Sequence, residues 1–440
     1  MASIILGIGF GLCSLSHAQM GGMGGGMGGG MPTIPGAEFG GATDPSALQT
    51  ADGLRLLPSV QVSERYDSNV FFAPKSALQG ANPEDFVTTV APQVRGMYVD
   101  REKLVKVNAV AGAVGSYFVN NTELSYVGAN TGVVLDMSDL VDQWRPGARF
   151  RVSDTYFYSP QPPAFLQGGQ HGAQANPLVA GFQAARTNTS SNSVNASFEF
   201  PLNRTLNLSG SYTHSFMHYG TPRVPGGVNL ISVNLHGYTA GLVKQLSLHD
   251  TVNVNFIGIE YDQGEVGTFS TRGSTLGWSH QFSPAVSIHV AGGMQLLSGE
   301  LNGVPFSLMA PSGSLAISWQ DSTTWMRLAY RSGIVPSYQF QGAAMLSHSV
   351  SFNITQQTPI RDLDGLLGAN YGVANEYGLN SPAALSWTTV TGTAGLLYRV
   401  TQKRFLTLVY SYLNVDNVFG GSHLAFDKHL VQLSLAQAFY

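Results

Sequence analysis

The sequence predicts an all-β fold, a transmembrane antiparallel up-and-down β-barrel of about 18 strands. Three observations support this prediction. Charged residues make up 11% of the chain, against about 25% in a typical soluble domain. From Leu57 to Tyr440, apolar and small polar residues alternate in stretches of roughly 10–16 residues. The connections between these stretches are alternately short and long, as in barrels with tight periplasmic turns and longer external loops.

The chain begins with a predicted leader and a predicted spacer. Residues 1–18 have the pattern of a secretory signal peptide, with an apolar stretch and a small-x-small cleavage site before Gln19. Residues 19–56 are rich in Gly and Met and are predicted to form a disordered tether, with partner binding as the alternative. The outer-membrane β-barrel is predicted for residues 57–440. The only cysteine, Cys13, lies in the leader, so no disulfide or cysteine metal site is expected.

The stretch from Val286 to Leu296 shows the alternation most clearly. Its even-numbered positions are mostly apolar and its odd-numbered positions are mostly small or polar. Because successive strand side chains point to opposite faces, each stretch has one oily and one wet face. Leu206 to Phe216 and Trp325 to Arg331 repeat the pattern. A closed barrel pairs every backbone polar group in hydrocarbon, which explains how a chain without an apolar helix can cross a membrane.

A soluble β-propeller is the alternative all-β architecture. It would show a sequence repeat of about 40–50 residues, and none is present. A soluble sheet would also carry Lys and Glu on its polar faces, whereas these stretches carry mostly Ser, Thr, Asn, Gly and Gln. The C-terminal stretch HLVQLSLAQAFY places Val431, Leu433, Leu435 and Phe439 on one face. A terminal aromatic residue is typical of outer-membrane barrels and resembles the signal read by the barrel-assembly machinery.

The first predicted strand ends in an unusual polar and aromatic stretch, ERYDSNVFFAP. We expect Tyr66, Phe71 and Phe72 to lie in the aromatic girdle at the membrane interface. Asp67 and Asn69 are expected to accept local backbone hydrogen bonds where the strand bends. The stretch from Arg65 to Phe71 also resembles the Tyr-Asp-x-Asn-hydrophobic signature of outer-membrane β-barrel porins of the type associated with exopolysaccharide or capsule export. The resemblance implies a barrel that passes solutes or polymer, and it brings no catalytic residue.

If the oily faces contact lipid, most basic strand residues point into the barrel. The predicted lumen-lining selectivity residues are Arg65, Arg95, Lys106, Arg149, Arg151, Arg327, Arg331 and Arg399. Rings of Arg or Lys favour anions in pores. The alternative is that loop carboxylates such as Asp139 and Asp142 pair with these cations and abolish any selectivity. Glu199 is expected to face inward, and so is Glu260 if a bulge near Ile257 shifts the alternation.

The longest loop, Ser159 to Thr189, is predicted to fold inward as a constriction or to lie on the surface. Its constriction candidates are Phe165, Phe182 and Arg186.

Two other functions remain open at this stage. A lipase-like barrel hydrolase would need a histidine between a nucleophile and an acid or amide, and His214 and His218 lie near Ser and Asn in sequence. A structural or adhesive barrel would act through its external loops. No HExxH, P-loop or GxSxG pattern occurs in the chain. We therefore expect no enzyme, no cofactor and no metal.

The sequence favours a porin-like channel in the outer membrane of a Gram-negative bacterium. It would allow passive passage of hydrophilic, preferably anionic, solutes or of an exported polysaccharide. The expected partners are outer-membrane lipid, the barrel-assembly machinery and these solutes, and the barrel would be monomeric or a homo-oligomer such as a trimer. Nucleic acid is not an expected partner, because the net charge is only −4.

Overall fold

The computed structural model describes residues 53–78, 80–159, 187–222, 232–264, 267–301, 304–336, 344–376, 385–419 and 422–439. The predicted signal peptide, most of the predicted tether and the constriction candidates Phe165, Phe182 and Arg186 lie outside these residues. The first strand begins at Gly53, inside the range predicted for the tether. The barrel wall therefore starts before residue 57.

Eighteen strands form the described structure. The first nine are β1 (Gly53–Asp67), β2 (Asp85–Val99), β3 (Lys106–Phe118), β4 (Tyr126–Asp136), β5 (Arg149–Ser159), β6 (Thr187–Asn203), β7 (Leu206–Pro222), β8 (Val233–Gln245) and β9 (Asp250–Asp262). The second nine are β10 (Thr268–Gln281), β11 (Val286–Leu301), β12 (Val304–Gln320), β13 (Thr324–Pro336), β14 (Ala344–Gln357), β15 (Leu363–Glu376), β16 (Leu385–Thr401), β17 (Arg404–Phe419) and β18 (Ser422–Ala438). In the part of the chain that the structure describes, the connections contain three short helices, η2 (Lys75–Ala77), η3 (Thr122–Leu124) and α2 (Ser138–Asp142).

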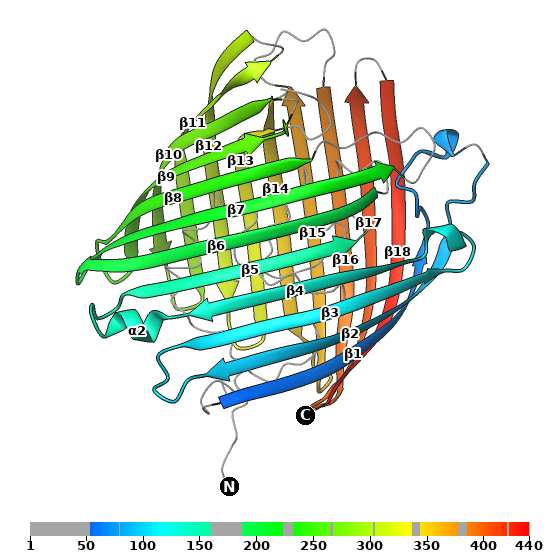
Figure 1. Ribbon diagram of the computed structural model, residues 1–440, viewed down its shortest axis with the longest axis horizontal. Helices are drawn as coiled ribbons and strands as arrows, with labels where there is room; N and C mark the ends of the chain where they lie inside the picture. The colour runs from blue at the N-terminus through cyan, green and yellow to red at the C-terminus, as the bar shows by residue number, and fades with distance from the viewer. Residues whose placement is uncertain are drawn as a thin grey trace.

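Each strand pairs antiparallel with its neighbours in the chain, and β1 also pairs with β18. This last pairing, from Ser59–Ala438 to Asp67–Leu430, closes the sheet into a barrel (Figure 1). The predicted all-β antiparallel up-and-down barrel of about 18 strands is confirmed. Among the described residues, no helix is long and apolar enough to cross a membrane.

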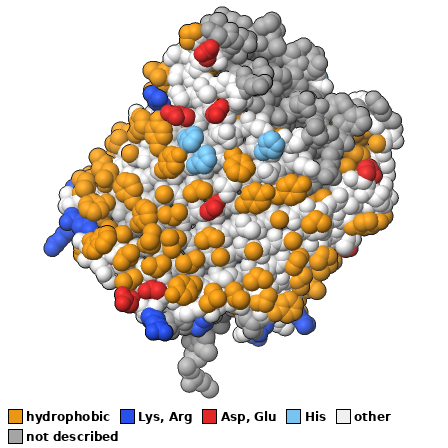
Figure 2. All heavy atoms as spheres, viewed as in Figure 1, with side chains coloured by type: hydrophobic (Ala, Val, Ile, Leu, Met, Phe, Trp, Pro, Cys, Tyr) orange, Lys and Arg blue, Asp and Glu red, His pale blue; other side chains and the backbone are white. Residues whose placement is uncertain are grey.

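The two faces of the barrel wall differ as the alternation predicts. Large apolar side chains are exposed on the outer face, among them Leu54 at 67%, Val127 at 71% and Leu276 at 61%. Figure 2 shows hydrophobic side chains spread across the outer surface of the front strands, with most charged side chains near its edges. At the C-terminus, Val431, Leu433, Leu435 and Phe439 are all exposed on this outer face.

One glycine on the outer face allows a ring to lie flat on the wall. A Cβ atom at Gly258 of β9 would collide with the ring of Tyr238 on β8. The two residues are direct partners across the strand pair. Gly258 therefore makes room for an aromatic ring that covers the backbone of the next strand.

The connections at one end of the barrel are short, as predicted. The turn between β6 and β7 spans residues 204–205, and that between β12 and β13 spans residues 321–323. In the second turn, the carboxylate of Asp321 accepts hydrogen bonds from the backbone N–H groups of Thr323 at 2.8 Å and Thr324 at 2.7 Å. These bonds to the charged form hold the pKa of Asp321 below its ordinary value.

Candidate functional site in the barrel interior

The stretch ERYDSNVFFAP lies where β1 ends beside β18, at the seam that closes the barrel. Tyr66 points outward, with its ring 5.4 Å from that of Phe86 on β2. Its hydroxyl donates to Glu84 Oε2 at 3.0 Å. The outward position agrees with the expectation of a girdle residue for Tyr66.

Asp67 points inward and is only 1% exposed. Its Oδ2 atom lies 2.8 Å from Nζ of Lys428, a residue of β18 that is also 1% exposed. The ammonium group of Lys428 also donates to the carbonyl oxygen of Asn69 at 2.9 Å. A buried charge is tolerated when it is paired and hydrogen-bonded, and Lys428 meets both conditions. The first and last strands are thus joined by a buried ion pair.

Asn69 turns the chain into the barrel. Its backbone N–H donates to Asp67 Oδ1 at 3.1 Å, and its Nδ2 atom donates to the carbonyl oxygen of Ala73 at 2.9 Å. The bond to Asp67 is the local Asx hydrogen bond expected at the end of the strand, and Asn69 Oδ1 accepts as expected from the backbone N–H of Ala73 at 3.4 Å. They reverse the chain so that the residues after Asn69 pack against the inner wall.

The expected girdle position is wrong for Phe71 and Phe72. Phe71 is 6% exposed and packs in a cluster with Val87 and Phe118, which belong to β2 and β3. Phe72 is 2% exposed and packs with residues of β17 and β18. The alternation of the strands places all of these partners on the inner face. The β1–β2 connection therefore bends into the barrel, because Asn69 and Lys428 hold its first turn there.

Phe72 has a strained backbone. Its φ is 56°, in a left-handed region that an aromatic residue adopts rarely. Its ring packs against Leu413, Val415 and Phe426, and Nζ of Lys428 lies 3.7 Å from the ring centroid. Tight packing and the cation over the ring offset the backbone strain. A segment inside the barrel narrows the space available to solute on this side.

The strand pairings place all eight predicted basic residues on the inner face. Four of them have carboxylate neighbours: Lys106 with Asp139 at 2.6 Å, Arg151 with Asp136 at 3.0 Å, Arg149 with Glu199 at 4.0 Å and Arg65 with Asp67 at 3.9 Å. Asp139 lies in the connection between β4 and β5. Its pairing with Lys106 agrees with the alternative that loop carboxylates neutralise the inward cations. Asp142 instead accepts a hydrogen bond from the backbone N–H of Gly147 at 2.6 Å.

The other four basic residues lie along the strands. Arg399 of β16 lies diagonally opposite Asp364 of β15 on the inner face, because Asp364 pairs with Leu397. Arg95 and Arg327 have no hydrogen bond or ion pair to their guanidinium groups among the described residues. Arg331 shares the inner face of β13 with Arg327, since they pair with Ser314 and Ser318 of β12. The loop-pairing alternative thus accounts for part of the set and leaves arginines of β2 and β13 facing the lumen.

Glu199 faces inward as expected, whereas Glu260 does not. The pairing of β8 with β9 runs without a register shift from Asn234–Asp262 to Gln245–Thr251. No bulge changes the alternation near Ile257, so Glu260 points outward. It lies 3.7 Å from Arg272 of β10 on that face.

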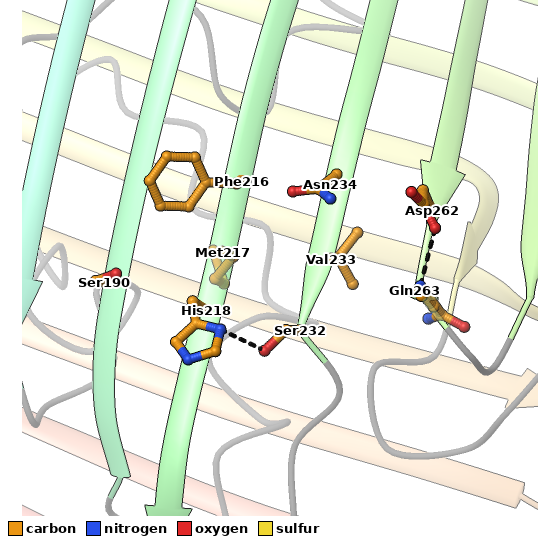
Figure 3. Close-up of a pocket in the computed structure, with 10 residues that line it drawn as sticks. Ser190, Phe216, Met217, His218, Ser232, Val233, Asn234, Asp262 and Gln263 are labelled. Carbon is orange, nitrogen blue, oxygen red and sulfur yellow. Dashed lines mark hydrogen bonds between the residues drawn. The ribbon is translucent and has the colours of Figure 1, made fainter.

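The histidines of the hydrolase hypothesis lie on the outer face. The ring of His214 is tilted by 33° against that of His236 on β8, with centroids 4.6 Å apart, and its Nδ1 has no hydrogen-bond partner among the described residues. His218 Nδ1 lies 3.2 Å from Ser232 Oγ, and both line a cavity of about 460 Å³ (Figure 3). Asp262 lines the same cavity but accepts from the backbone N–H of Gly264. A Ser-His-Asp relay needs the acid on the histidine, which this arrangement lacks.

The sequence analysis missed Lys428 and Asp85, and it did not include Gln61 among the candidate site residues. Lys428 could have been found by extending the alternation back from Val431, which places a lysine on the inner face. Asp85 of β2 is 1% exposed and accepts from the backbone N–H groups of three residues, Val119, Asn120 and Asn121. Gln61 of β1 is 4% exposed and faces inward. Within the described residues, no group of three or more His, Cys, Asp or Glu side chains could hold a metal ion.

No family model matches the chain, and no curated protein matches it in sequence. Solved structures with a similar arrangement of strands include OccAB2 of Acinetobacter baumannii, with a TM-score of 0.48 and 10% identity over 88% of this chain and 98% of that one. OccK2 (OpdF) of Pseudomonas aeruginosa gives a TM-score of 0.46 and 9% identity, over 87% and 98% of the two chains. OccK11 (OpdR) of the same species gives 0.44 and 13%, over 89% and 99%. At these identities and TM-scores the similarity establishes no family.

Proposed function

We propose that the chain is a non-enzymatic outer-membrane channel for hydrophilic solutes, with a preference for anions. The sidedness of the wall carries this proposal. Large apolar side chains are exposed on the outside, whereas Arg95 and Arg327 face inward without a carboxylate partner among the described residues. A closed barrel with an apolar exterior fits lipid. Barrels of about 16–18 strands enclose an aqueous channel.

The charge on the inner wall supports anions over cations. A guanidinium group keeps its charge at all physiological pH values, so an unpaired arginine attracts anions and repels cations. Arg327 and Arg331 reinforce each other because they lie on the same face of one strand. The paired cations Lys106 and Arg151 contribute less, since their carboxylate partners cancel most of the field.

Ion selectivity in planar bilayers tests the proposal. The purified full-length protein is reconstituted, and the reversal potential is measured across a potassium chloride gradient. We expect the sign that corresponds to chloride preference. The Arg95→Gln/Arg327→Gln variant should shift the reversal potential toward zero. Arg204→Gln, which removes an exposed charge from the β6–β7 turn, should leave it unchanged. A cation preference of the wild-type channel would contradict the proposal.

The same purified protein allows two further tests, one for passage of a polymer and one for hydrolysis of phospholipid. An acidic oligosaccharide added to one side should reduce the open current if polymer enters the lumen, and an uncharged sugar of equal size serves as the control. Phospholipid hydrolysis that is lost with Ser232→Ala would instead support the hydrolase and contradict a purely passive channel. We also propose that the barrel-assembly machinery is a partner of the chain, and that the channel is a monomer or a homo-oligomer.

A further inference from the structure

The cavity of about 460 Å³ lies on the outer face, where β6 to β9 reach the end of the barrel with the long connections. Three of its side chains form a row, namely Phe216 of β7, Asn234 of β8 and Asp262 of β9. Asn234 is the direct cross-strand partner of both other residues, and such partners have Cβ atoms about 5 Å apart. Figure 3 shows the three residues side by side. The row gives the cavity an aromatic side and a polar side.

The cavity lies beyond the apolar part of the outer wall. Two residues from Asp262 toward the short turns, Glu260 of β9 lies 3.7 Å from Arg272 of β10, and both side chains are more than half exposed. Charged side chains are costly on the lipid face near the middle of the membrane and cost little near the interface. Lipid head groups and water, rather than acyl chains, therefore meet the barrel at this level.

The polar side chains of the row are available to a ligand. In the part of the chain that the structure describes, the side-chain amide of Asn234 makes no hydrogen bond. Asp262 uses only Oδ1, which accepts from the backbone N–H of Gly264 at 2.9 Å. Asn234 therefore offers a donor and an acceptor next to the second carboxylate oxygen of Asp262.

His218 adds a donor with a defined position. Ser232 Oγ accepts from the backbone N–H of Tyr219 at 3.2 Å, so its own proton can bond Nδ1 of His218, which lies 3.2 Å away. Nε2 of the histidine then carries the ring proton. Figure 3 shows this second ring nitrogen directed away from Ser232. Ser190, the cross-strand partner of His218, places a hydroxyl group beside the ring.

The composition of the lining excludes three classes of ligand. The carboxylate of Asp262 repels a phosphate or a carboxylate. Within the described residues, no group of three or more His, Cys, Asp or Glu side chains could hold a metal ion. A purely apolar ligand would cover the amide of Asn234 and the carboxylate of Asp262 without bonding them, which is costly. An uncharged ligand rich in hydroxyl groups meets none of these objections.

We propose that this cavity binds a sugar ring of a neutral saccharide. A pyranose ring has an apolar C–H face, which packs on an aromatic ring such as that of Phe216. Its neighbouring hydroxyl groups each donate and accept, which matches the side-by-side groups of Asn234 and Asp262. The volume lies within the range of roughly 300–1,000 Å³ that small-molecule sites occupy. The site is on the outside of the barrel, so this inference is independent of the proposed channel.

Saturation-transfer NMR on the purified full-length protein, in a detergent without a sugar head group, tests the site. The probes are the methyl glycosides of glucose, galactose, mannose and N-acetylglucosamine, and sorbitol is the control because it has hydroxyl groups but no ring. We expect at least one glycoside to bind and sorbitol not to bind. Phe216→Ala should raise the dissociation constant at least about tenfold. Phe198→Ala, which removes a ring from the outer face of β6, should leave it unchanged.

A second variant tests the hydrogen bonds rather than the ring. Asn234→Ala should raise the dissociation constant about fivefold, since hydrogen bonds to the hydroxyl groups are lost. Asn414→Ala on the outer face of β17 is its control and should bind like the wild type. Binding of none of the four glycosides, or equal binding by the wild type, Phe216→Ala and Asn234→Ala, would overturn the inference.

Nanodiscs distinguish a soluble saccharide from the sugar of a membrane lipid. The protein is placed in discs that contain galactosyl diacylglycerol and phosphatidylcholine, and native mass spectrometry shows which lipid it retains. Retention of the galactolipid that falls in Phe216→Ala would assign the site to a lipid head group. Binding of the methyl glycosides alone would assign it to a soluble saccharide. The reversal potential of Phe216→Ala should equal that of the wild type, so failure of this inference and failure of the proposed channel are distinguishable.

Discussion

The seam at β18 and β1 and the wall at β13 both place cations on the inner face, but in opposite settings. At the seam, Lys428 is 1% exposed, with its ammonium group 2.8 Å from Asp67 and 2.9 Å from a backbone oxygen. On β13, Arg327 has no carboxylate partner among the described residues. A cation buried with its partners stabilises a particular strand closure, whereas a cation left facing the lumen acts on solutes. Position on the inner face alone therefore does not identify a selectivity residue.

The largest effect should come from breaking the ion pair at the seam. Lys428→Met leaves Asp67 buried without its closest partner, and we expect a loss of about 3–5 kcal/mol in the free energy of unfolding. Urea unfolding in lipid vesicles measures it. The Asp67→Asn/Lys428→Met variant should lose less than the sum of the two single variants, because neither charge remains unpaired. Additive losses would mean that the two side chains do not act as a pair.

A second test near the seam uses Asp85, whose carboxylate has no ion-pair partner among the described residues. Asp85→Ala removes the acceptor for three backbone N–H groups of the β3–β4 connection. We expect a loss of about 2 kcal/mol, since unpaired donors in partly buried positions are costly. Asp85→Asn keeps part of the acceptor capacity and should lose less. If the free energy of unfolding of both variants equals that of the wild type, the carboxylate of Asp85 does not stabilise this connection.

The turn before β13 should contribute a smaller, pH-dependent effect. The pKa of Asp321 lies below its ordinary value of 3.8 because the backbone N–H groups of Thr323 and Thr324 stabilise the carboxylate. A carboxylate with a lowered pKa stabilises the fold above its unfolded-state pKa, and the contribution is lost as the pH falls through the folded-state pKa. The Asp321→Ala variant should therefore unfold at a slightly lower urea concentration than the wild type at pH 7. At pH 2 the two proteins should unfold at the same urea concentration. A difference that persists at pH 2 would point to another cause.

The smallest effect on stability is expected for the lumen-facing arginine of β13. Arg327→Gln breaks no ion pair, so its free energy of unfolding should stay within about 0.5 kcal/mol of the wild type. Its reversal potential in a salt gradient should nevertheless move toward zero. Loss of stability without a change in selectivity would reverse the contrast between the two regions and show that Arg327 has a structural role.

Two elements show how far the sequence could predict the site. The eight basic residues could be assigned to the inner face, because the alternation along one strand fixes the face of each side chain. Which of them are paired could not be predicted. Lys106 finds Asp139 in a different connection, and Lys428 finds Asn69 from a position 359 residues away. The inward bend of Phe71 and Phe72 was missed for the same reason, since Lys428 holds that turn.

The sequence by itself determined the sidedness of this protein and the approximate number of strands in its wall. Both follow from local patterns, namely a two-residue alternation and the length of successive connections, which need no knowledge of distant residues. Only the tertiary structure decided which inner charges cancel and which remain. Closure of the sheet brings β18 against β1, and the energy of a charge depends on what lies within a few ångströms of it. That neighbourhood exists only after the barrel has closed.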